Sequence, residues 1–208
     1  MNIYFLSDIH GNLPALETAL KNIESEAKKI FLGDIVNYGP WSNECVELID
    51  TLDNKITIMG NHEKYFLENF KFNNSVVEKF FNKTYSNFRN INIIKNYIND
   101  YVFDKFYCTH TIENKKIFID TKVNLNSDCI IGHTHQQYIN NKNLYKIINP
   151  GSIGQNRFDI KLVSYCRFNT KNKTFQFFNI EYDYNLIINK MRSLNYPSEC
   201  LEYYLKKI

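Results

Sequence analysis

The sequence predicts an α/β fold built on a parallel β-sheet. In the N-terminal half, short apolar runs alternate with segments whose apolar residues recur at helical spacing. Such an order gives parallel strands joined by right-handed crossovers. Short polar motifs follow several of the apolar runs, and open α/β sheets bind ligands at the carboxyl ends of their strands. The length of 208 residues suits one domain with a sizeable core, so we expect a single domain over residues 1–208.

The first predicted strand, Ile3–Leu6, leads into a helix. Asn12 is placed to cap this helix, and Pro14 lies in its first turn. The apolar residues that follow share one helical face, and they are Leu13, Leu16, Leu20, Ile23 and Ala27. A second strand, a second helical face and a third strand are then predicted at Ile30–Leu32, Cys45–Leu52 and Ile56–Met59.

The rest of the chain mixes helices and strands. Residues 64–100 are rich in Phe, Tyr and Asn and are predicted to be mostly helical. Three apolar runs predict strands at Lys105–Cys108, Cys129–Ile131 and Tyr145–Ile148. Two longer runs flank the turn residues 169–172 and predict a hairpin of Leu162–Phe168 with Thr174–Ile180. Two tail helices are expected, at Asn185–Ser193 and Ser198–Lys206.

The composition excludes several classes of protein. Hydrophobic residues make up 44% and charged residues 23%, which is ordinary for a globular protein. The net charge is +3 with no basic cluster, so neither a nucleic-acid patch nor a membrane patch is predicted. No stretch reaches the ~20 apolar residues of a membrane span, and Asn2–Ser7 lacks the basic start of a signal peptide.

The cysteines favour a reduced, cytoplasmic protein. They are five in number and form no CxxC pair, which argues against a zinc ribbon and a thioredoxin-type site. We expect them to be core residues, and they are Cys45, Cys108, Cys129, Cys166 and Cys200.

All five histidines lie in short polar motifs. In chain order the motifs are Asp8-Ile9-His10, Gly33-Asp34, Gly60-Asn61-His62-Glu63, His110 and Gly132-His133-Thr134-His135. Together they offer carboxylates, an amide oxygen and imidazoles, the ligands for two metal ions ~3.5–4 Å apart that share a bridging carboxylate. Each motif alone is weak, and a histidine beside a strand is more often structural. The ordered set is specific, and it predicts a two-metal hydrolase site.

These motifs resemble those of the calcineurin-like metallophosphoesterase superfamily. More narrowly, the chain resembles the compact bacterial and archaeal phosphodiesterase-like proteins that lack a cap domain. The resemblance also includes Leu32–Pro40, Asn149–Gln155 and Tyr182-Asp183. It implies a four-layer α-β-β-α sandwich. It further implies that Asp8, His10 and His135 hold one ion, that Asp34 bridges, and that Asn61, His110 and His133 hold the other.

The resemblance gives His62 a separate role, as an uncoordinated catalytic imidazole. His62 would protonate the leaving oxygen or stabilise charge on the phosphoryl group, while a metal-bridging hydroxide attacks phosphorus. Glu63 stands where Asp is commoner, and it could orient His62 from behind. The second motif lacks the GDxxDRG ending of many protein phosphatases, which weakens that function. The presence of His62 leaves cleavage of monoesters open beside diesters.

Four other residues each keep two interpretations. Arg157 could clamp a substrate phosphate or be an exposed loop arginine. Tyr38 and Trp41 could stack on a nucleobase, although packing at the rim or in the core is favoured. Cys108 could reach the metal side of its strand, although a structural thiol is favoured.

The sequence therefore predicts a cytoplasmic phosphoesterase of small phosphoesters or nucleotide-like diesters, with two divalent transition-metal ions. Mn, Fe, Zn, Ni and Co suit the ligand set, and Mn is favoured. The alternatives are a phosphoprotein or dinucleoside-polyphosphate phosphatase and, from another class, a metal-binding scaffold without turnover. The chain has no long insertion for a cap, so we expect an open groove, with residues 64–100 as the candidate lid. The sequence predicts no oligomeric state.

Overall fold

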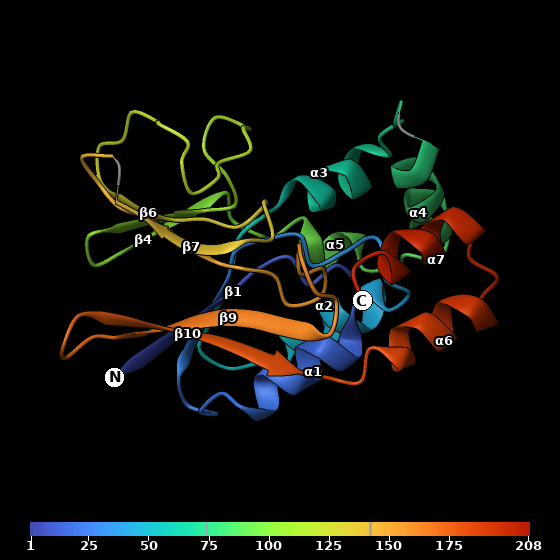
Figure 1. The fold of residues 1–208 in the computed structure, drawn as a ribbon, viewed down its shortest axis with the longest axis horizontal. Helices are drawn as coiled ribbons and strands as arrows, with labels where there is room; N and C mark the ends of the chain where they lie inside the picture. Colours follow the sequence, from blue (N-terminus) through green and yellow to red (C-terminus); the bar gives the residue numbers. More distant parts are fainter. Residues whose placement is uncertain (74, 142) are drawn as a thin grey trace.

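Two mixed five-stranded β-sheets lie face to face in the molecule, with helices around them (Figure 1). The structure is a computed structural model, and it describes residues 1–73, 75–141 and 143–208. The arrangement is an α/β sandwich, which confirms the fold class expected from the sequence.

The first sheet joins the N-terminal strands to the C-terminal hairpin in the order β10-β9-β1-β2-β3. Its strands are β1 (Asn2–Leu6), β2 (Lys28–Phe31), β3 (Lys55–Thr57), β9 (Leu162–Asn169) and β10 (Thr174–Glu181). The pairs β1–β2 and β2–β3 are parallel, as the strand and helix order predicted. The predicted hairpin extends this parallel part, because β9 pairs antiparallel with both β1 and β10.

The second sheet has the order β4-β5-β6-β8-β7. Its strands are β4 (Asp100–Phe103), β5 (Phe106–Thr109), β6 (Asp128–Ile130), β7 (Gln137–Asn140) and β8 (Ile147–Pro150). The inner strands β5, β6 and β8 are parallel, and the edge strands β4 and β7 are antiparallel. Neither edge strand was predicted from the sequence, because neither contains the continuous apolar run of a strand buried on both faces.

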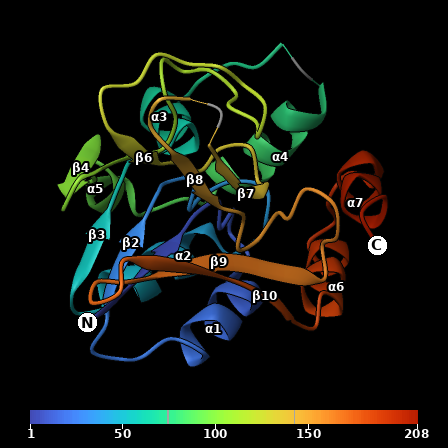
Figure 2. The same ribbon diagram turned by 60° about the vertical axis from the view of Figure 1, so that its left-hand side comes forward.

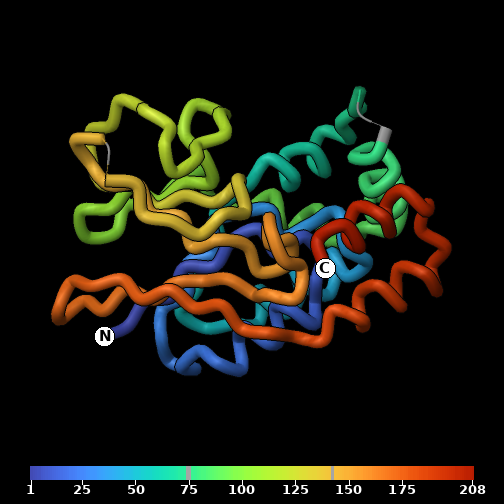
Figure 3. Tube along the Cα trace, viewed as in Figure 1, coloured from blue at the N-terminus to red at the C-terminus, as the bar shows by residue number. Residues whose placement is uncertain are grey.

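The helices gather on one side and at one end of the sandwich. They are α1 (Leu13–Lys21), α2 (Ser42–Asp50), α3 (Asn61–Glu68), α4 (Ser75–Tyr85), α5 (Ile91–Ile94), α6 (Asn185–Ser193) and α7 (Ser198–Leu205). Although far apart in sequence, α4 and α7 pack side by side (Figure 2). The chain ends at this helical end, away from the N-terminus (Figure 3). Within the described ranges, no helix has the length and apolar character to cross a membrane.

Two apolar clusters hold the layers together. One fills the space between the sheets and includes Phe5, Ile30 and Phe106. The other joins the first sheet to α1 and α2 and includes Leu16 and Val46. All five cysteines are buried free thiols, as expected for core residues.

Helix α1 begins as predicted and ends earlier. The Asn12 side chain accepts a hydrogen bond from the Ala15 backbone N–H at 3.3 Å, which confirms the N-cap. The helix stops at Lys21, whereas Ile23 and Ala27 were expected on its apolar face. Both are nevertheless buried in the same cluster, because the chain beyond α1 packs against it in a turn. Apolar spacing therefore predicted burial correctly here and helix length incorrectly.

Candidate metal centre

Five strands deliver the predicted polar motifs to one rim of the sandwich. Asp8, Asp34 and Asn61 follow β1, β2 and β3, while His110 and His133 follow β5 and β6. Parallel pairing within each sheet makes these strands end at the same edge.

The first group at the rim consists of Asp8, His10 and His135. Their ligand atoms all lie within 4.8 Å of one another. His10 Nε2 is 3.1 Å from His135 Nε2, and Asp8 Oδ1 is 3.4 Å from His135 Nε2. Two motifs separated by more than half of the chain thus meet at one point.

The second group consists of Asp34, His110 and His133, with Asn61 beside it. His110 Nε2 lies 3.2 Å from both His133 Nδ1 and Asp34 Oδ2, and 2.9 Å from Asn61 Oδ1. Asp34 Oδ2 is also 3.9 Å from His10 Nε2, so this carboxylate lies between the two groups. The structure therefore brings together all seven residues that the sequence suggested as ligands.

Backbone carbonyls determine which nitrogen of three imidazoles faces the rim. Nδ1 of His10 lies 3.3 Å from the Val36 carbonyl oxygen. The corresponding distances are 2.7 Å from His110 to Leu32 and 2.9 Å from His135 to Gln155. A carbonyl oxygen only accepts, so each Nδ1 carries a hydrogen. The neutral rings therefore present bare Nε2 lone pairs to the rim.

As a consequence, hydrogen-bond acceptor atoms of different side chains face one another at the rim. The Nε2 atoms of His10 and His135 face each other at 3.1 Å, and His110 Nε2 faces an amide oxygen and a carboxylate. Lone pairs at these distances repel unless a cation or a proton lies among them. Imidazole nitrogens with carboxylate and amide oxygens are ligands of divalent transition metals. The residues fit two such ions.

In the metal-free protein, a proton on His110 takes the place of a cation. Burial acts to lower the pKa of His110, but the Asp34 carboxylate outweighs burial and raises this pKa to about 9. Burial and the neighbouring His110 lower the pKa of His133 to about 4. Burial also acts to raise the pKa of Asp34, yet His110 and His62 hold it well below its usual range. Asp34 is therefore an ionised carboxylate.

Five of the suggested ligands adopt the left-handed backbone conformation. Their φ angles are 54° at Asp8, 49° at His10, 54° at Asp34, 70° at His133 and 58° at His135. Non-glycine residues rarely adopt this region, at a cost of ~1–3 kcal/mol each, and such strain gathers at functional sites. The fold thus tolerates strain where it aims these side chains at the rim.

Two glycines allow the motifs to approach one another. A Cβ atom on Gly132 would lie 1.9 Å from Ser7 Oγ, and one on Gly60 would lie 2.2 Å from Asp34 Oδ1. Both contacts are far too short for any side chain, so glycine at these two positions lets the motifs lie close together.

Glu63 supports the Asp34 loop, where the sequence suggested that it orients His62. One carboxylate oxygen accepts from the backbone N–H groups of Asp34 at 2.9 Å and Gly60 at 2.7 Å. The other accepts from those of Ile35 at 2.7 Å and Val36 at 3.1 Å. The glutamate side chain is long enough to reach the loop that follows β2, and its hydrogen bonds hold the backbone of that loop in place.

His62 lies beside Asp34. Its Nε2 is 3.9 Å from Asp34 Oδ2, and its backbone N–H donates to Asp34 Oδ1 at 2.8 Å. His62 also falls within 4.8 Å of ligand atoms of His10 and Asp34, so geometry alone permits a ligand role for it. Its other ring nitrogen, Nδ1, contacts the Asn37 side chain at 2.8 Å.

A cavity of about 350 Å³ opens above this rim. Besides groups of the centre, its walls are mainly aromatic and cationic, and they include Tyr38, Tyr65, Phe72, Lys116, Phe118, Arg157 and Tyr203. Tyr38 packs on the rings of His10 and His62, with centroids at 4.8 and 5.2 Å. Arg157 is exposed at the cavity edge.

Three of these wall residues were not suggested by the sequence. Lys116 and Phe118 lie in the irregular segment after β5, and Tyr203 comes from α7. None stands in a motif. Tyr203 stands beside Tyr204, which is fully buried, and adjacent helix positions point in different directions.

The two remaining candidates serve packing. Cys108 is fully buried in the cluster between the sheets. Trp41 packs against two apolar clusters near α2. Both outcomes agree with the interpretation that the sequence favoured.

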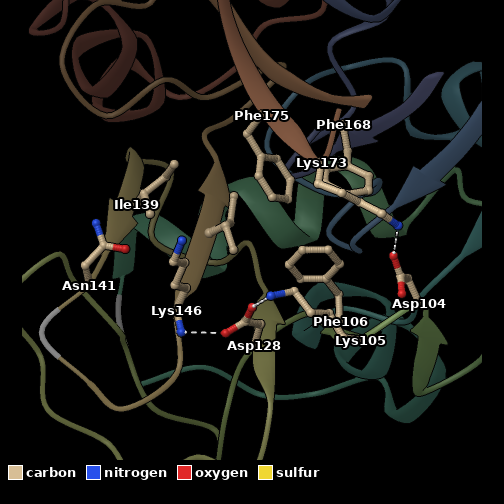
Figure 4. A pocket seen from close by; sticks show the side chains of 11 residues that line it. Asp104, Lys105, Phe106, Asp128, Ile139, Asn141, Lys146, Phe168, Lys173 and Phe175 are labelled. Atoms are coloured by element: carbon tan, nitrogen blue, oxygen red, sulfur yellow. Dashed lines mark hydrogen bonds and ion pairs between the residues drawn. The ribbon is translucent and has the colours of Figure 1, made fainter. Parts of the chain in front are cut away.

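A second cavity, of about 400 Å³, lies between the sheets at the end opposite the rim (Figure 4). Phe106, Phe168 and Phe175 form its apolar wall, and the ion pair of Lys105 with Asp128, at 2.7 Å, borders it. No histidine is among its described lining residues. Among the residues that the structure describes, the side chains that could bind metal are therefore found at the rim and not at this second cavity.

Comparisons with known proteins identify relatives of this chain. The family model described as calcineurin-like phosphoesterase matches residues 1–188. An uncharacterized protein of Methanocaldococcus jannaschii is 31% identical over 87% of this chain and 88% of its own length. The crystal structure of a metallophosphoesterase from Sphaerobacter thermophilus, 24% identical, has a TM-score of 0.81 and covers 100% of this chain and 99% of its own. The symmetrical bis(5'-nucleosyl)-tetraphosphatase of Coxiella burnetii is 33% identical over 32% of this chain and 24% of that enzyme.

Proposed function

Because this chain belongs to the calcineurin-like phosphoesterase family and is a phosphoester hydrolase, we propose that it works through two metal ions held at the rim. Asp34 would bridge the ions. Asp8, His10 and His135 would complete one site, and Asn61, His110 and His133 the other.

The observation that carries this proposal is the set of ligand atoms that converge at the rim, among them two imidazole nitrogens that face each other as acceptors. His10 and His135 direct bare Nε2 atoms at each other at 3.1 Å, and Asp34 lies between the two groups. Two bound ions would clamp the phosphate and lower the pKa of a shared water. The set mixes oxygen and nitrogen ligands without a thiolate, which suits Mn among the divalent transition metals.

The chain's own residues would bind and orient the substrate. Arg157 and Lys116 border the cavity and could each pair with a phosphate oxygen. The aromatic rings of Tyr65, Phe118 and Tyr203 line the same cavity and could pack on a base or an aryl group. A small nucleotide-like phosphoester is therefore the proposed substrate.

A dinucleoside polyphosphate is the second candidate substrate. Two cationic side chains at the cavity edge match a substrate with more than one phosphate, and 32% of the chain matches a symmetrical bis(5'-nucleosyl)-tetraphosphatase. The protein is proposed to be a single domain. It is further proposed to act in the cytoplasm, because its five buried free thiols suit a reducing compartment.

Metal analysis combined with a turnover panel tests the proposal. Protein reconstituted with Mn should hold two ions per chain and hydrolyse at least one of p-nitrophenyl phosphate, bis(p-nitrophenyl) phosphate and diadenosine tetraphosphate. Asp34→Asn should lose metal and turnover, whereas Asp50→Asn, at an exposed position on α2, should keep both. Full metal content without turnover on any substrate would instead support a metal-binding scaffold.

A further inference from the structure

Asn37 is a buried polar residue that contacts the imidazole of His62. It lies in the loop after β2, three residues beyond Asp34, and is completely buried. Its side-chain amide contacts His62 Nδ1 at 2.8 Å. Its φ of 73° is in the left-handed region, which asparagine tolerates better than most residues.

The surroundings of Asn37 define which end of its amide faces His62. The Tyr38 backbone N–H donates to one atom of the amide at 2.7 Å. A backbone N–H only donates, so that atom is the oxygen. The Thr84 hydroxyl of α4 contacts the same atom at 3.1 Å. The group facing His62 is therefore the amide NH2, which can only donate.

This geometry fixes the hydrogen on the His62 ring. Nδ1 must accept from Asn37, so the ring hydrogen lies on Nε2. Nε2 in turn faces the rim, 3.9 Å from Asp34 Oδ2, and His62 lines the cavity above it. A hydrogen on Nδ1 would place two donors against each other at 2.8 Å.

We infer that Asn37 is a positioning residue that holds His62 in the tautomer with its hydrogen on Nε2. This inference deepens the proposed function and rests on it. A neutral imidazole that gave up its Nε2 hydrogen would become an anion, so it is a poor proton donor. It is a good hydrogen-bond donor to an oxygen on which charge develops. Of the two roles open for His62, the geometry selects charge stabilisation.

The inference also narrows the substrate class. Without a proton donor, the leaving group must depart as a stable anion. Aryl phosphates and phosphoanhydrides satisfy this condition, whereas simple alkyl phosphates do not. Nucleoside polyphosphates are phosphoanhydrides, so the cationic and aromatic walls of the cavity suit the same class.

The tautomer can be read without any turnover. Zinc-loaded protein with nitrogen-labelled histidine gives long-range proton–nitrogen NMR spectra, and His62→Ala assigns the His62 signals. We expect His62 Nδ1 to carry no hydrogen. In Asn37→Asp the carboxylate accepts in place of the NH2 group, so the hydrogen should move to Nδ1. Thr84→Val leaves the Tyr38 contact in place and should keep the original pattern. A hydrogen on His62 Nδ1 in the unmodified protein would overturn the inference.

Leaving-group preference supplies the second measurement. In Asn37→Asp, His62 can become a proton donor, so the preference in kcat/KM for p-nitrophenyl phosphate over butyl phosphate should fall about tenfold or more. Placed on a His62→Ala background, Asn37→Asp should leave that preference unchanged, because Asn37 acts through His62. An equal change on both backgrounds would refute the positioning role. If the unmodified protein hydrolyses nothing, the proposed function fails, and the NMR result still decides the role of Asn37.

Discussion

Glu63→Gln should destabilise the protein strongly although it changes one atom. Each carboxylate oxygen of Glu63 accepts two backbone N–H groups, those of Asp34 and Gly60 on one side and those of Ile35 and Val36 on the other. A glutamine amide has only one accepting end. Whichever way the amide turns, its NH2 faces two buried N–H donors.

The size of the effect follows from that count. Leaving a buried donor unsatisfied costs ~1–3 kcal/mol, so two donors cost ~2–6 kcal/mol. A natural protein has ~5–15 kcal/mol of stability in all, so Glu63→Gln should lose a large part of it. The Asp34 loop should loosen with it, and metal should bind more weakly.

Urea unfolding of the metal-free protein measures the first effect, and metal titration measures the second. Glu68→Gln is the matched control, because Glu68 is exposed on the same helix α3. The control should change stability by less than ~0.5 kcal/mol. Equal stabilities for the two variants would refute the reasoning that Glu63 pins the Asp34 loop.

Three further outcomes are expected. His62→Ala should keep its metal and lose turnover by ~10²–10⁴-fold, which metal analysis beside steady-state kinetics can check; loss of metal would make His62 a ligand. At pH 7, metal loading should release at least one proton, the one on His110, because the pKa of His110 is raised to about 9 whereas that of His133 is lowered to about 4. Calorimetry in buffers of different ionisation enthalpy measures that proton, and no release at pH 7 would contradict a protonated His110. Tyr203→Ala should raise KM for a nucleotide substrate by ~10-fold with little change in kcat, since it removes stacking that the ground state and transition state share. An unchanged KM would exclude Tyr203 from the substrate wall.

The sequence predicted the positions at the rim because their chemistry is written in short motifs. Asp8 and His10 follow β1 within a few residues and Asp34 follows β2 in the same way, so a rule about parallel strand ends places them together. The hydrogen-bond partners that aim them could not be predicted. His10 and His135 are oriented by the carbonyl groups of Val36 and Gln155, and every residue has such a group.

The features that the sequence did not predict, or predicted differently, also have physical explanations. Glu63 was expected behind His62 because the two are adjacent in sequence, whereas its carboxylate reaches the loop after β2. Tyr203 reaches the cavity because α7 packs on α4, a contact that depends on tertiary structure alone. Strands β4 and β7 are the edge strands of the second sheet. They are less buried than the inner strands, so their apolar pattern is weak. Local pattern therefore predicted which side chains meet at the rim, and long-range packing determined their surroundings.

The number and position of bound metal ions test the central claim most directly. Crystals of the Mn-loaded protein should show two anomalous scattering peaks, one among Asp8, His10 and His135 and one among Asn61, His110 and His133, with Asp34 between them. Asp34→Asn should lose at least one of these peaks. A single ion in the unmodified protein, or two ions that do not share Asp34, would contradict the two-metal centre.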